Sequence, residues 1–278
     1  MDQYQGKVKL LEGKTGLIMG VANQDSIAWH IALMALAHGA KIYITHQERL
    51  TKWVDKLVQS VTPQMIKTLV CEVESDESIE MCCAQIEDNI DFVVYGPAFA
   101  NSDELRGEYL GMNRENFAQA LNISCYSLIP VLKNLLHKLN PESSVLALTY
   151  HGSQKVIPCY DLMGIAKAAL EANVRYLSYY LGGKKIRVNA LSAGPVRTLA
   201  ASRGIRGYNV LEEYYAKNAP LERNITVEEA AKSALYLLSD LSSGVTGETH
   251  YVDCGFNIMG VKNPRTDNID LSSYRDAE

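Results

Sequence analysis

Short apolar runs alternate with longer amphipathic segments along almost the whole chain. The apolar runs predict strands at 14–20, 40–46, 66–72, 91–95, 143–150, 185–191 and 248–252. The amphipathic segments predict helices at 25–38, 48–60, 75–88, 113–139, 160–181 and 226–240. This alternation is typical of βαβ units, so the predicted fold class is α/β, a doubly wound parallel sheet of seven strands with helices on both faces.

No linker, repeat or low-complexity tract interrupts this alternation, so we expect one domain over 1–260 and a polar, frayed tail over 261–278. The segment 197–218 is too long for a simple strand-to-helix connection, where about two to six residues are usual. We expect it to form a substrate-binding lid with short helices of its own. The expected apolar lining of this lid is Leu199, Ile205, Tyr208 and Val210.

Composition narrows the class of protein. With 27 Lys and Arg against 32 Asp and Glu, the net charge of −5 argues against a nucleic-acid partner. No apolar stretch reaches the roughly 20 residues of a membrane span, and the polar N-terminus lacks a signal pattern, so we expect a cytoplasmic protein without a membrane partner. The six cysteines lack metal-binding spacing, so we expect reduced thiols and no metal site.

The turn after the first strand has features of a dinucleotide site. Gly20 ends the strand, and Ser26 and Ala28 are small residues at the start of the next helix. A tight turn and exposed amides at a helix start can bind a pyrophosphate in a Rossmann-type sheet. The pattern is not GxGxxG, and an ordinary turn with Asp25 or Ser26 as helix cap is the alternative. Asp25 must point away from any phosphate.

The end of the second strand bears on the choice of cofactor. Gln47 stands where such sheets bind the adenosine ribose, and it carries no charge for a 2′-phosphate. We therefore expect NADH rather than NADPH, although Arg49 keeps NADPH as an alternative. The start of a solvated helix at 47–49 is the structural alternative.

A tyrosine and a lysine seven residues apart provide the sharpest chemical signal. On a helix, Tyr160 and Lys167 would share one face about 10 Å apart along the axis, with Tyr150 ending the preceding strand. Lys167 could bind a nicotinamide ribose, while the Tyr160 hydroxyl donates to a developing oxyanion. The alternative is that Tyr160 only begins a helix and Lys167 is a solvated surface lysine.

These motifs occur in one order, together with GIAKAALEANVRYL (164–177), VNALSAGPVRTLAAS (188–202) and LSSGVTGETHYVDCGF (241–256). Over about 12–260 the chain resembles the bacterial enoyl-acyl-carrier-protein reductases of the short-chain dehydrogenase/reductase superfamily. Classical members use Tyr-x3-Lys, but Gly164 follows Tyr160 by four residues and Gln154 follows Tyr150 by four. Only the enoyl reductase spacing fits.

The resemblance implies reduction of the trans-2 double bond of enoyl thioesters in type II fatty acid biosynthesis, with NADH as cofactor, acyl carrier protein as partner and a homotetramer as assembly. It implies the catalytic residues Tyr150, Tyr160 and Lys167. The cofactor-binding residues implied are Gly20, Ser26, Ile27, Gln47, Glu72, Val73, Pro97, Lys167, Val196, Arg197, Thr198, Leu199 and Ala200. The substrate-binding residues implied are Ala100, Tyr150, Tyr160 and Met163.

The chain departs from the family pattern at three places. Gly96-Pro97-Ala98 replaces a Ser-Ile-Gly-like turn, Glu72 stands for an aspartate, and Cys254 replaces a glycine, which tests whether that turn needs a positive φ. Two rival functions stay open: a carbonyl reductase or alcohol dehydrogenase with Tyr160 as general acid, and a non-catalytic dinucleotide sensor.

Overall fold

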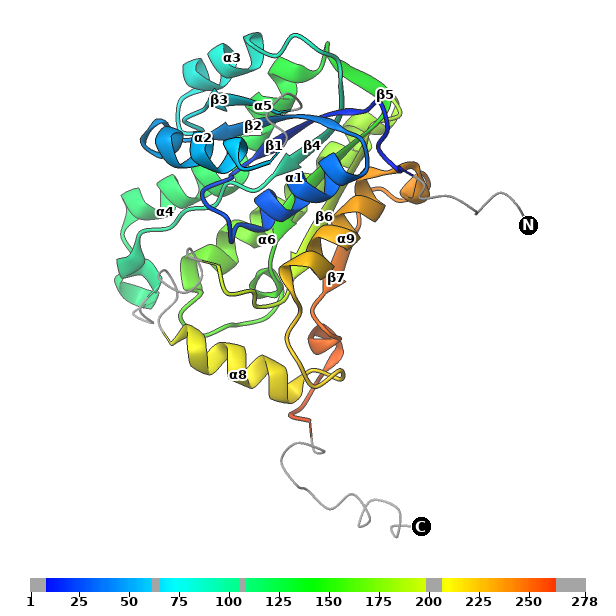
Figure 1. The fold of residues 1–278 in the computed structure, drawn as a ribbon. Helices are drawn as coiled ribbons and strands as arrows, with labels where there is room; N and C mark the ends of the chain where they lie inside the picture. The colour runs from blue at the N-terminus through cyan, green and yellow to red at the C-terminus, as the bar shows by residue number, and fades with distance from the viewer. Residues whose placement is uncertain (1–8, 62–65, 106–108, 199–206, 264–278) are drawn as a thin grey trace, which may run out of the picture.

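Seven parallel strands form one sheet in the computed structural model, which describes residues 9–61, 66–105, 109–198 and 207–263 (Figure 1). The strands are β1 (Thr15–Met19), β2 (Lys41–His46), β3 (Ile66–Val70), β4 (Ile90–Tyr95), β5 (Leu139–Thr149), β6 (Arg187–Ala193) and β7 (Thr249–Val252). Their order is β3-β2-β1-β4-β5-β6-β7, and each neighbouring pair is parallel. The predicted sheet is confirmed, and its order reverses between β1 and β4, where such sheets bind ligands.

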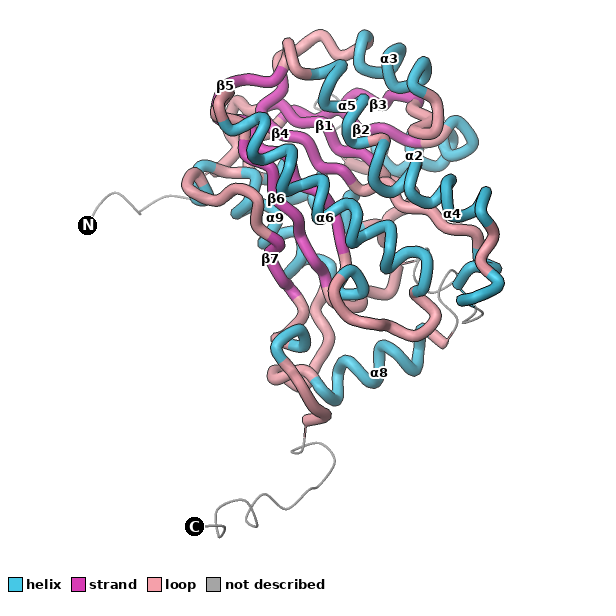
Figure 2. The backbone as a smooth tube through the Cα atoms, turned by 180° about the vertical axis from the view of Figure 1, so that it is seen from behind, coloured by secondary structure: helices cyan, strands magenta, loops and turns pink. Residues whose placement is uncertain are grey.

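Helices cover both faces of this sheet. Figure 1 looks onto the face covered by α1, α2 and α9, and Figure 2 shows α3, α4, α5 and α6 on the opposite face. The helices are α1 (Ile27–Ala37), α2 (Thr51–Gln59), α3 (Asp76–Ala84), α4 (Arg114–Leu121), α5 (Leu128–Leu135), α6 (Asp161–Gly182), α8 (Tyr208–Asn218) and α9 (Val227–Leu238). The helix α8 lies beyond the end of the sheet, within the segment expected to contain short helices of its own.

The hydrophobic core has one part on each face of the sheet. Ile18 and Val94 pack into the part beneath α1 and α9, whereas Leu17 and Val93 pack into the part beneath α3, α5 and α6. Successive side chains of a strand point to opposite faces, so a strand buried on both sides consists almost entirely of apolar residues. The continuous apolar runs of the sequence therefore become the central strands.

The prediction of one continuous helix over 113–139 is wrong. The segment divides into α4, a π-helical turn η6 (Asn122–Tyr126) and α5, and Leu139 already belongs to β5. Proline has no amide to donate and fits only the first turn of a helix. Pro130 therefore requires a helix that begins just before it, and α5 begins at Leu128.

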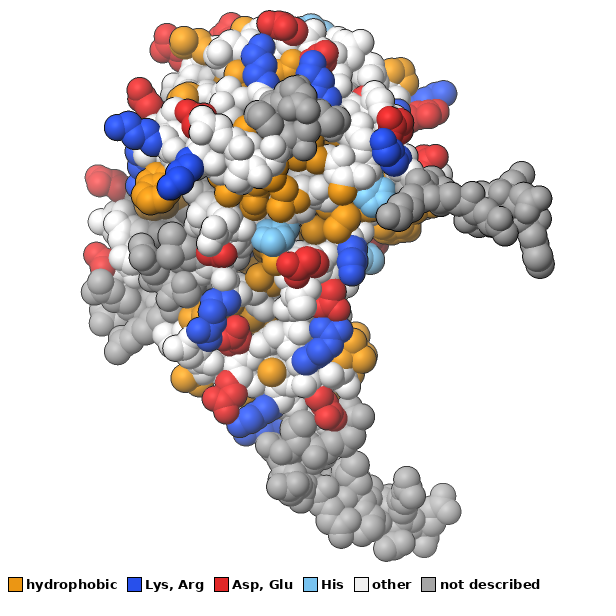
Figure 3. All heavy atoms as spheres, in the orientation of Figure 1, with side chains coloured by type: hydrophobic (Ala, Val, Ile, Leu, Met, Phe, Trp, Pro, Cys, Tyr) orange, Lys and Arg blue, Asp and Glu red, His pale blue; other side chains and the backbone are white. Residues whose placement is uncertain are grey.

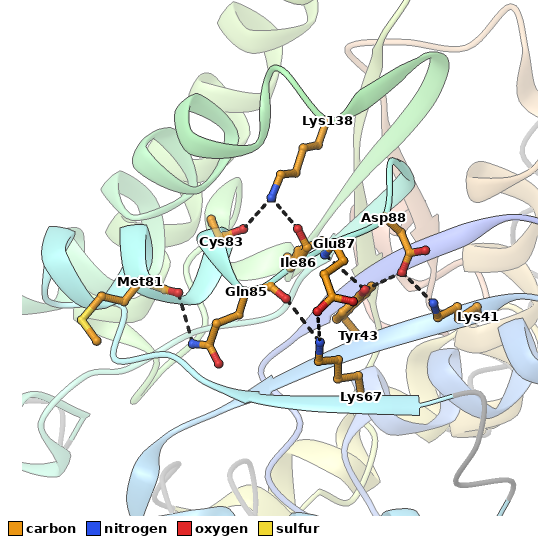
Figure 4. Close-up of polar contacts among 10 residues, drawn as sticks. All are labelled: Lys41, Tyr43, Lys67, Met81, Cys83, Gln85, Ile86, Glu87, Asp88 and Lys138. Atoms are coloured by element: carbon orange, nitrogen blue, oxygen red, sulfur yellow. Dashed lines mark hydrogen bonds and ion pairs between the residues drawn. The ribbon is translucent and has the colours of Figure 1, made fainter.

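A polar cluster lies at the amino-terminal ends of strands β2 to β5 (Figure 4). The candidate site residues lie at the opposite, carboxyl-terminal ends of the strands. The Lys138 ammonium donates to the carbonyls of Cys83 and Ile86, the last of which follows α3. Asp88 accepts from the Tyr43 hydroxyl and pairs with Lys41 at 2.7 Å. A cation at a helix C-terminus is favourable because it meets unpaired carbonyls and the negative end of the dipole. The cluster therefore fixes the connection from α3 to β4.

Several features bear on environment and partners. No helix in the described ranges is long and apolar enough to cross a membrane, and acidic and basic side chains are interspersed over the face in Figure 3. All six cysteines are free thiols.

Asn263 lies in the segment expected to fray, but it is buried and its amide donates to Asn218 at 2.9 Å. The expectation of a frayed tail is wrong at this residue, and 264–278 lie outside the described residues.

Candidate active site

The candidate site residues lie where the parallel strands end. In chain order, Gly20 follows β1, Gln47 follows β2, Glu72 and Val73 follow β3, Pro97 and Ala100 follow β4, Tyr150 follows β5, and Val196, Arg197 and Thr198 follow β6. Ser26 and Ile27 lie at the start of α1, and Tyr160, Met163 and Lys167 lie in the first two turns of α6. Leu199, Ala200 and Ile205, also expected at the site, lie outside the described residues.

The turns after β1 and β4 touch at the switch point of the sheet. Gly20 has φ +88°, and a Cβ there would lie 2.7 Å from the backbone carbon of Gly96. A Cβ on Gly96 would in turn lie 2.8 Å from the Met19 carbonyl oxygen. Only glycines permit this approach, so Gly96 is required by its contact with the first turn. Pro97 follows directly, and its nitrogen would lie 3.0 Å from a Cβ on Gly20.

Ser26, at the start of α1, was expected to bind the cofactor, but its hydroxyl is hydrogen-bonded within its own loop. The amides of Ala22 and Asn23 donate to the Ser26 hydroxyl at 3.3 and 3.1 Å. They face into the loop, so the phosphate-binding groups that remain at this helix start are the first amides of α1, beginning with Ile27. Ser26 is the residue at the cap position but accepts no capping bond from the helix, and Asp25 is exposed.

Polar side chains link the ends of β2 and β3. The Glu72 carboxylate accepts from the Glu48 amide at 2.8 Å and from the Gln47 side chain at 3.4 Å. The side-chain oxygen of Gln47 accepts from the Arg49 guanidinium at 2.8 Å. Because Glu72 keeps the acceptor character of an aspartate, the substitution is compatible with a hydrogen-bonding role at this end. Val73 packs beside these groups against the core.

Tyr150 and Tyr160 meet in a cluster of aromatic and apolar side chains. Their ring centroids lie 4.8 Å apart at an interplanar angle of 73°. The Tyr150 hydroxyl donates to the Tyr215 hydroxyl of α8 at 2.9 Å, and Tyr215 stacks on Phe256 at 3.7 Å. The cluster also contains Ala100, Leu105, Ile157, Met163 and Leu211. The structure therefore brings together all four residues expected to bind substrate.

Burial keeps the phenols of this cluster protonated. It raises the pKa of the Tyr160 hydroxyl above its ordinary value, and the neighbouring Tyr150 and Glu171 add to the rise. Burial likewise raises the pKa of Tyr150 and of Tyr215. Within the described part of the chain, no hydrogen-bond acceptor is paired with the Tyr160 hydroxyl. It is thus a neutral donor available to an oxygen that gains negative charge.

Lys167 is buried, which overturns the alternative of a solvated surface lysine. Its side chain is 5% exposed, and its ammonium donates to the Leu148 carbonyl at 2.7 Å. Burial lowers the pKa of Lys167 to about 8, while the negative charge of Glu171 raises it. An ammonium has three donors, so it can also serve hydroxyl groups of a ligand.

The segment after β6 runs to α8. Val196 packs against the core, and the Arg197 guanidinium pairs with Glu212 and donates to Asn209 at 3.1 Å. The Thr198 amide donates to the Val196 carbonyl at 2.7 Å. The Arg197 side chain is therefore directed to α8.

Two residues expected to line the lid differ in burial. Tyr208 is buried, but Val210 is 72% exposed. Its expected role as lid lining is therefore wrong. Leu211 and Tyr215, which lie on another side of α8, pack into the tyrosine cluster instead, because residues only one position apart on a helix do not share a face.

Cys254 stands where the family has a glycine, and the turn there does have a positive φ. Cys254 has φ +57° and the following Gly255 has φ +85°. A side chain in this left-handed region is strained by about 1–2 kcal/mol relative to glycine. The cysteine therefore occupies the conformation for which glycine is suited.

The geometry has the form that a dinucleotide-dependent reductase requires. A family model described as Enoyl-(Acyl carrier protein) reductase matches residues 20–257. The chain belongs to the enoyl-acyl-carrier-protein reductase family. It is 47% identical over 256 residues to the NADH enoyl-acyl-carrier-protein reductase FabI of Rickettsia typhi, a match covering 91% of this chain and 97% of that protein.

Solved structures of this family share the fold. The crystal structure of FabI from Candidatus Liberibacter asiaticus has a TM-score of 0.87 and 41% identity, covering 91% of this chain and 99% of that one. The reductase from Anaplasma phagocytophilum, solved in complex with NAD, has a TM-score of 0.84 and 41% identity, covering 91% and 95%. The family resemblance inferred from the motifs is confirmed.

Sequence reasoning missed two parts of this reductase site. Tyr215 and Phe256 reach the tyrosines from distant segments, and no spacing rule connects them to Tyr150. Glu171 was detectable, because it follows Lys167 by four residues and therefore shares its helix face.

We expect Tyr215→Phe to lower the free energy of unfolding by about 1–2 kcal/mol, because the buried Tyr150 hydroxyl loses its acceptor. Urea unfolding followed by circular dichroism measures the change. Tyr214→Phe is the matched control, since Tyr214 is 42% exposed on the same helix, and it should leave stability unchanged. Equal stability of the two variants would contradict the structural importance of the hydrogen bond.

Proposed function

We propose that this protein reduces the trans-2 double bond of enoyl thioesters carried by acyl carrier protein, as a step of type II fatty acid biosynthesis, with NADH as reductant. The observation that carries the proposal is the neutral, buried Tyr160 beside Tyr150, with the buried Lys167 on the same helix at the spacing of the enoyl reductases. The Rickettsia typhi relative is named as an NADH-dependent enoyl reductase, which supports the same activity.

The residues at the strand ends suit a dinucleotide. Gly20 and Gly96 let the turns after β1 and β4 approach closely at the switch point, and the first amides of α1 can bind a pyrophosphate there. Gln47 is uncharged and hydrogen-bonded to Glu72, an arrangement that favours ribose hydroxyls over a 2′-phosphate. In this proposal Lys167 donates to the nicotinamide ribose. Val73 would flank the adenine, and Ile27, Pro97, Val196, Arg197, Thr198, Leu199 and Ala200 complete the proposed cofactor set.

NADH supplies a hydride to the β-carbon when it is bound. The protein must then stabilise the negative charge that develops on the thioester oxygen, until the α-carbon takes up a proton from Tyr160 or from solvent. The Tyr160 hydroxyl donates to that oxygen, and its raised pKa keeps the proton in place at neutral pH. Tyr150, Met163 and Ala100 form the wall beside it, where their apolar surfaces exclude water and strengthen the hydrogen bond.

Turnover with three reactants tests the proposed function. We expect the purified protein to consume NADH with a trans-2-enoyl thioester, but not with a 3-ketoacyl thioester, and to use NADPH more slowly. The decrease in NADH absorbance measures the rate. Turnover only on the ketone would identify a carbonyl reductase, and NADH binding without turnover on either substrate would identify a sensor.

Two variants separate the proposed roles of the tyrosine and the lysine. Tyr160→Phe should lower kcat on the order of 10²–10³-fold, because it removes one oxyanion donor, while NADH affinity stays unchanged. Lys167→Ala should instead raise the Kd for NADH. Steady-state kinetics and NADH fluorescence titration measure these effects, with Tyr179→Phe, exposed on α6, as control. Full activity of Tyr160→Phe would reject its role.

We further propose a homotetramer that works in the cytoplasm. Tyr176, Tyr179 and Tyr180 of α6 are 68%, 79% and 72% exposed, and Ile129 of α5, on the same side of the sheet, is 42% exposed. Such an apolar helical face favours burial against a second copy. The six free thiols fit a reducing compartment.

Light scattering tests the assembly. We expect a mass of four chains for the wild type and smaller species for Tyr179→Glu, because a charge would be buried at the interface. Tyr109→Glu is the control for an exposed tyrosine elsewhere, since Tyr109 is 53% exposed in another element. A wild-type monomer would reject the tetramer.

A further inference from the structure

A buried carboxylate lies behind the proposed catalytic residues. Glu171 is 3% exposed in the middle of α6. One oxygen, Oε1, accepts from the Thr149 hydroxyl at 2.8 Å and from the Ser153 hydroxyl at 2.6 Å. The other oxygen, Oε2, accepts from the Gln154 side-chain amide at 3.2 Å. Burying a carboxylate is costly unless it is paired and hydrogen-bonded, so this cluster of three donors is a specific arrangement.

These donors belong to the segment that carries Tyr150. Thr149 ends β5, and Ser153 and Gln154 lie in and after the 3₁₀ turn η7 (His151–Ser153). Glu171 therefore attaches both ends of this segment to α6, the helix that begins beside Tyr160. The distance between the two tyrosine rings depends on how this segment sits on α6.

The same carboxylate acts electrostatically on Lys167, one helical turn away on α6. Four residues on a helix correspond to about one turn, so the two side chains are neighbours on one face. Both residues are buried, so their charges interact with little screening by solvent. The titratable and charged groups that act on Lys167, Glu171 and the adjoining turn are Tyr160 on α6, Cys125 on η6, His151 on η7, Lys155 after it, Tyr251 on β7 and Asp253 after β7.

We infer that Glu171 is a positioning residue for the proposed reduction: it holds the Tyr150 segment against α6 and supplies the negative charge that keeps the Lys167 side chain an ammonium ion for NADH. The inference rests on the proposed function. Glu171 touches neither substrate nor cofactor in this scheme. It acts through Lys167 and through the 149–154 segment.

The sign of the electrostatic effect follows from the charges. Burial disfavours the charged form of Lys167 and brings its pKa to about 8, and the Glu171 carboxylate opposes that decrease. Removing the negative charge of Glu171 leaves only Cys125 to oppose burial, so the pKa of Lys167 falls further. An opposite charge within about 4–6 Å shifts a pKa by about 1–3 units. NADH affinity should therefore decline at a lower pH when Glu171 is neutral.

Glu171→Gln tests the inference. It keeps an oxygen for the Thr149 and Ser153 hydroxyls and changes mainly the charge. We expect the Kd for NADH, measured by fluorescence from pH 6 to 10, to begin its rise about 1–3 pH units earlier than in the wild type. The alkaline limb of kcat/KM should move in the same direction. Glu171→Asp, which restores the charge on a shorter side chain, should lie between the two.

Two controls assign the effect. Glu80→Gln removes an exposed glutamate of α3 and should leave both pH profiles unchanged. In a Lys167→Arg background the guanidinium stays charged over this range, so adding Glu171→Gln should no longer shift the profile.

The outcomes separate the inference from the function on which it rests. A variant with lower thermal stability but an unshifted NADH profile would show a structural role only and overturn the inference. If Glu171→Gln does not fold, Glu171→Ala also removes the charge, and an unshifted NADH profile of that variant overturns the inference equally. A shifted binding profile in a protein that does not reduce enoyl thioesters would reject the proposed function and keep only the role of Glu171 in holding Lys167 charged for NADH. A wild type that does not bind NADH would overturn both.

Discussion

Parallel pairing places the carboxyl ends of all seven strands on one edge of the sheet, and the candidate site depends on this geometry. The residues that follow β1 to β6 are spread over most of the chain, yet they become neighbours there. The contact between Gly20 and Gly96 fixes the closest approach, at the point where the strand order reverses. A side chain at either glycine would separate the turns and widen the proposed cofactor site.

Burial gives the side chains at this edge their chemical character. The same loss of water that raises the pKa of Tyr160 lowers that of Lys167. Each shift favours the neutral form, which suits the tyrosine as a donor but opposes the charge of the lysine. The negative charge of Glu171, one helical turn from Lys167, raises the pKa of Lys167 against this effect of burial. Burial can therefore keep Tyr160 neutral while Lys167 retains its charge.

The sequence predicted the elements well where a single pattern determined them. The seven strands and the helices α1, α6 and α9 were expected near their observed bounds, because each is a long apolar or amphipathic segment. The helix expected over 113–139 was wrong because periodicity does not show a π-helical turn, although Pro130 was a visible signal. Val210 was assigned to the lid lining without a helix register, and the register of α8 places it in solvent.

The sequence by itself determined the fold class, the family and the spacing of Tyr160 and Lys167, since these depend on local pattern and on residues close together in the chain. Only the tertiary structure decided that Lys167 is buried, that Tyr150 donates to Tyr215, and that Thr149 and Ser153 share the Glu171 carboxylate. These contacts join different strands and helices. Burial and hydrogen bonding between distant segments are set by packing in three dimensions, which no local pattern records.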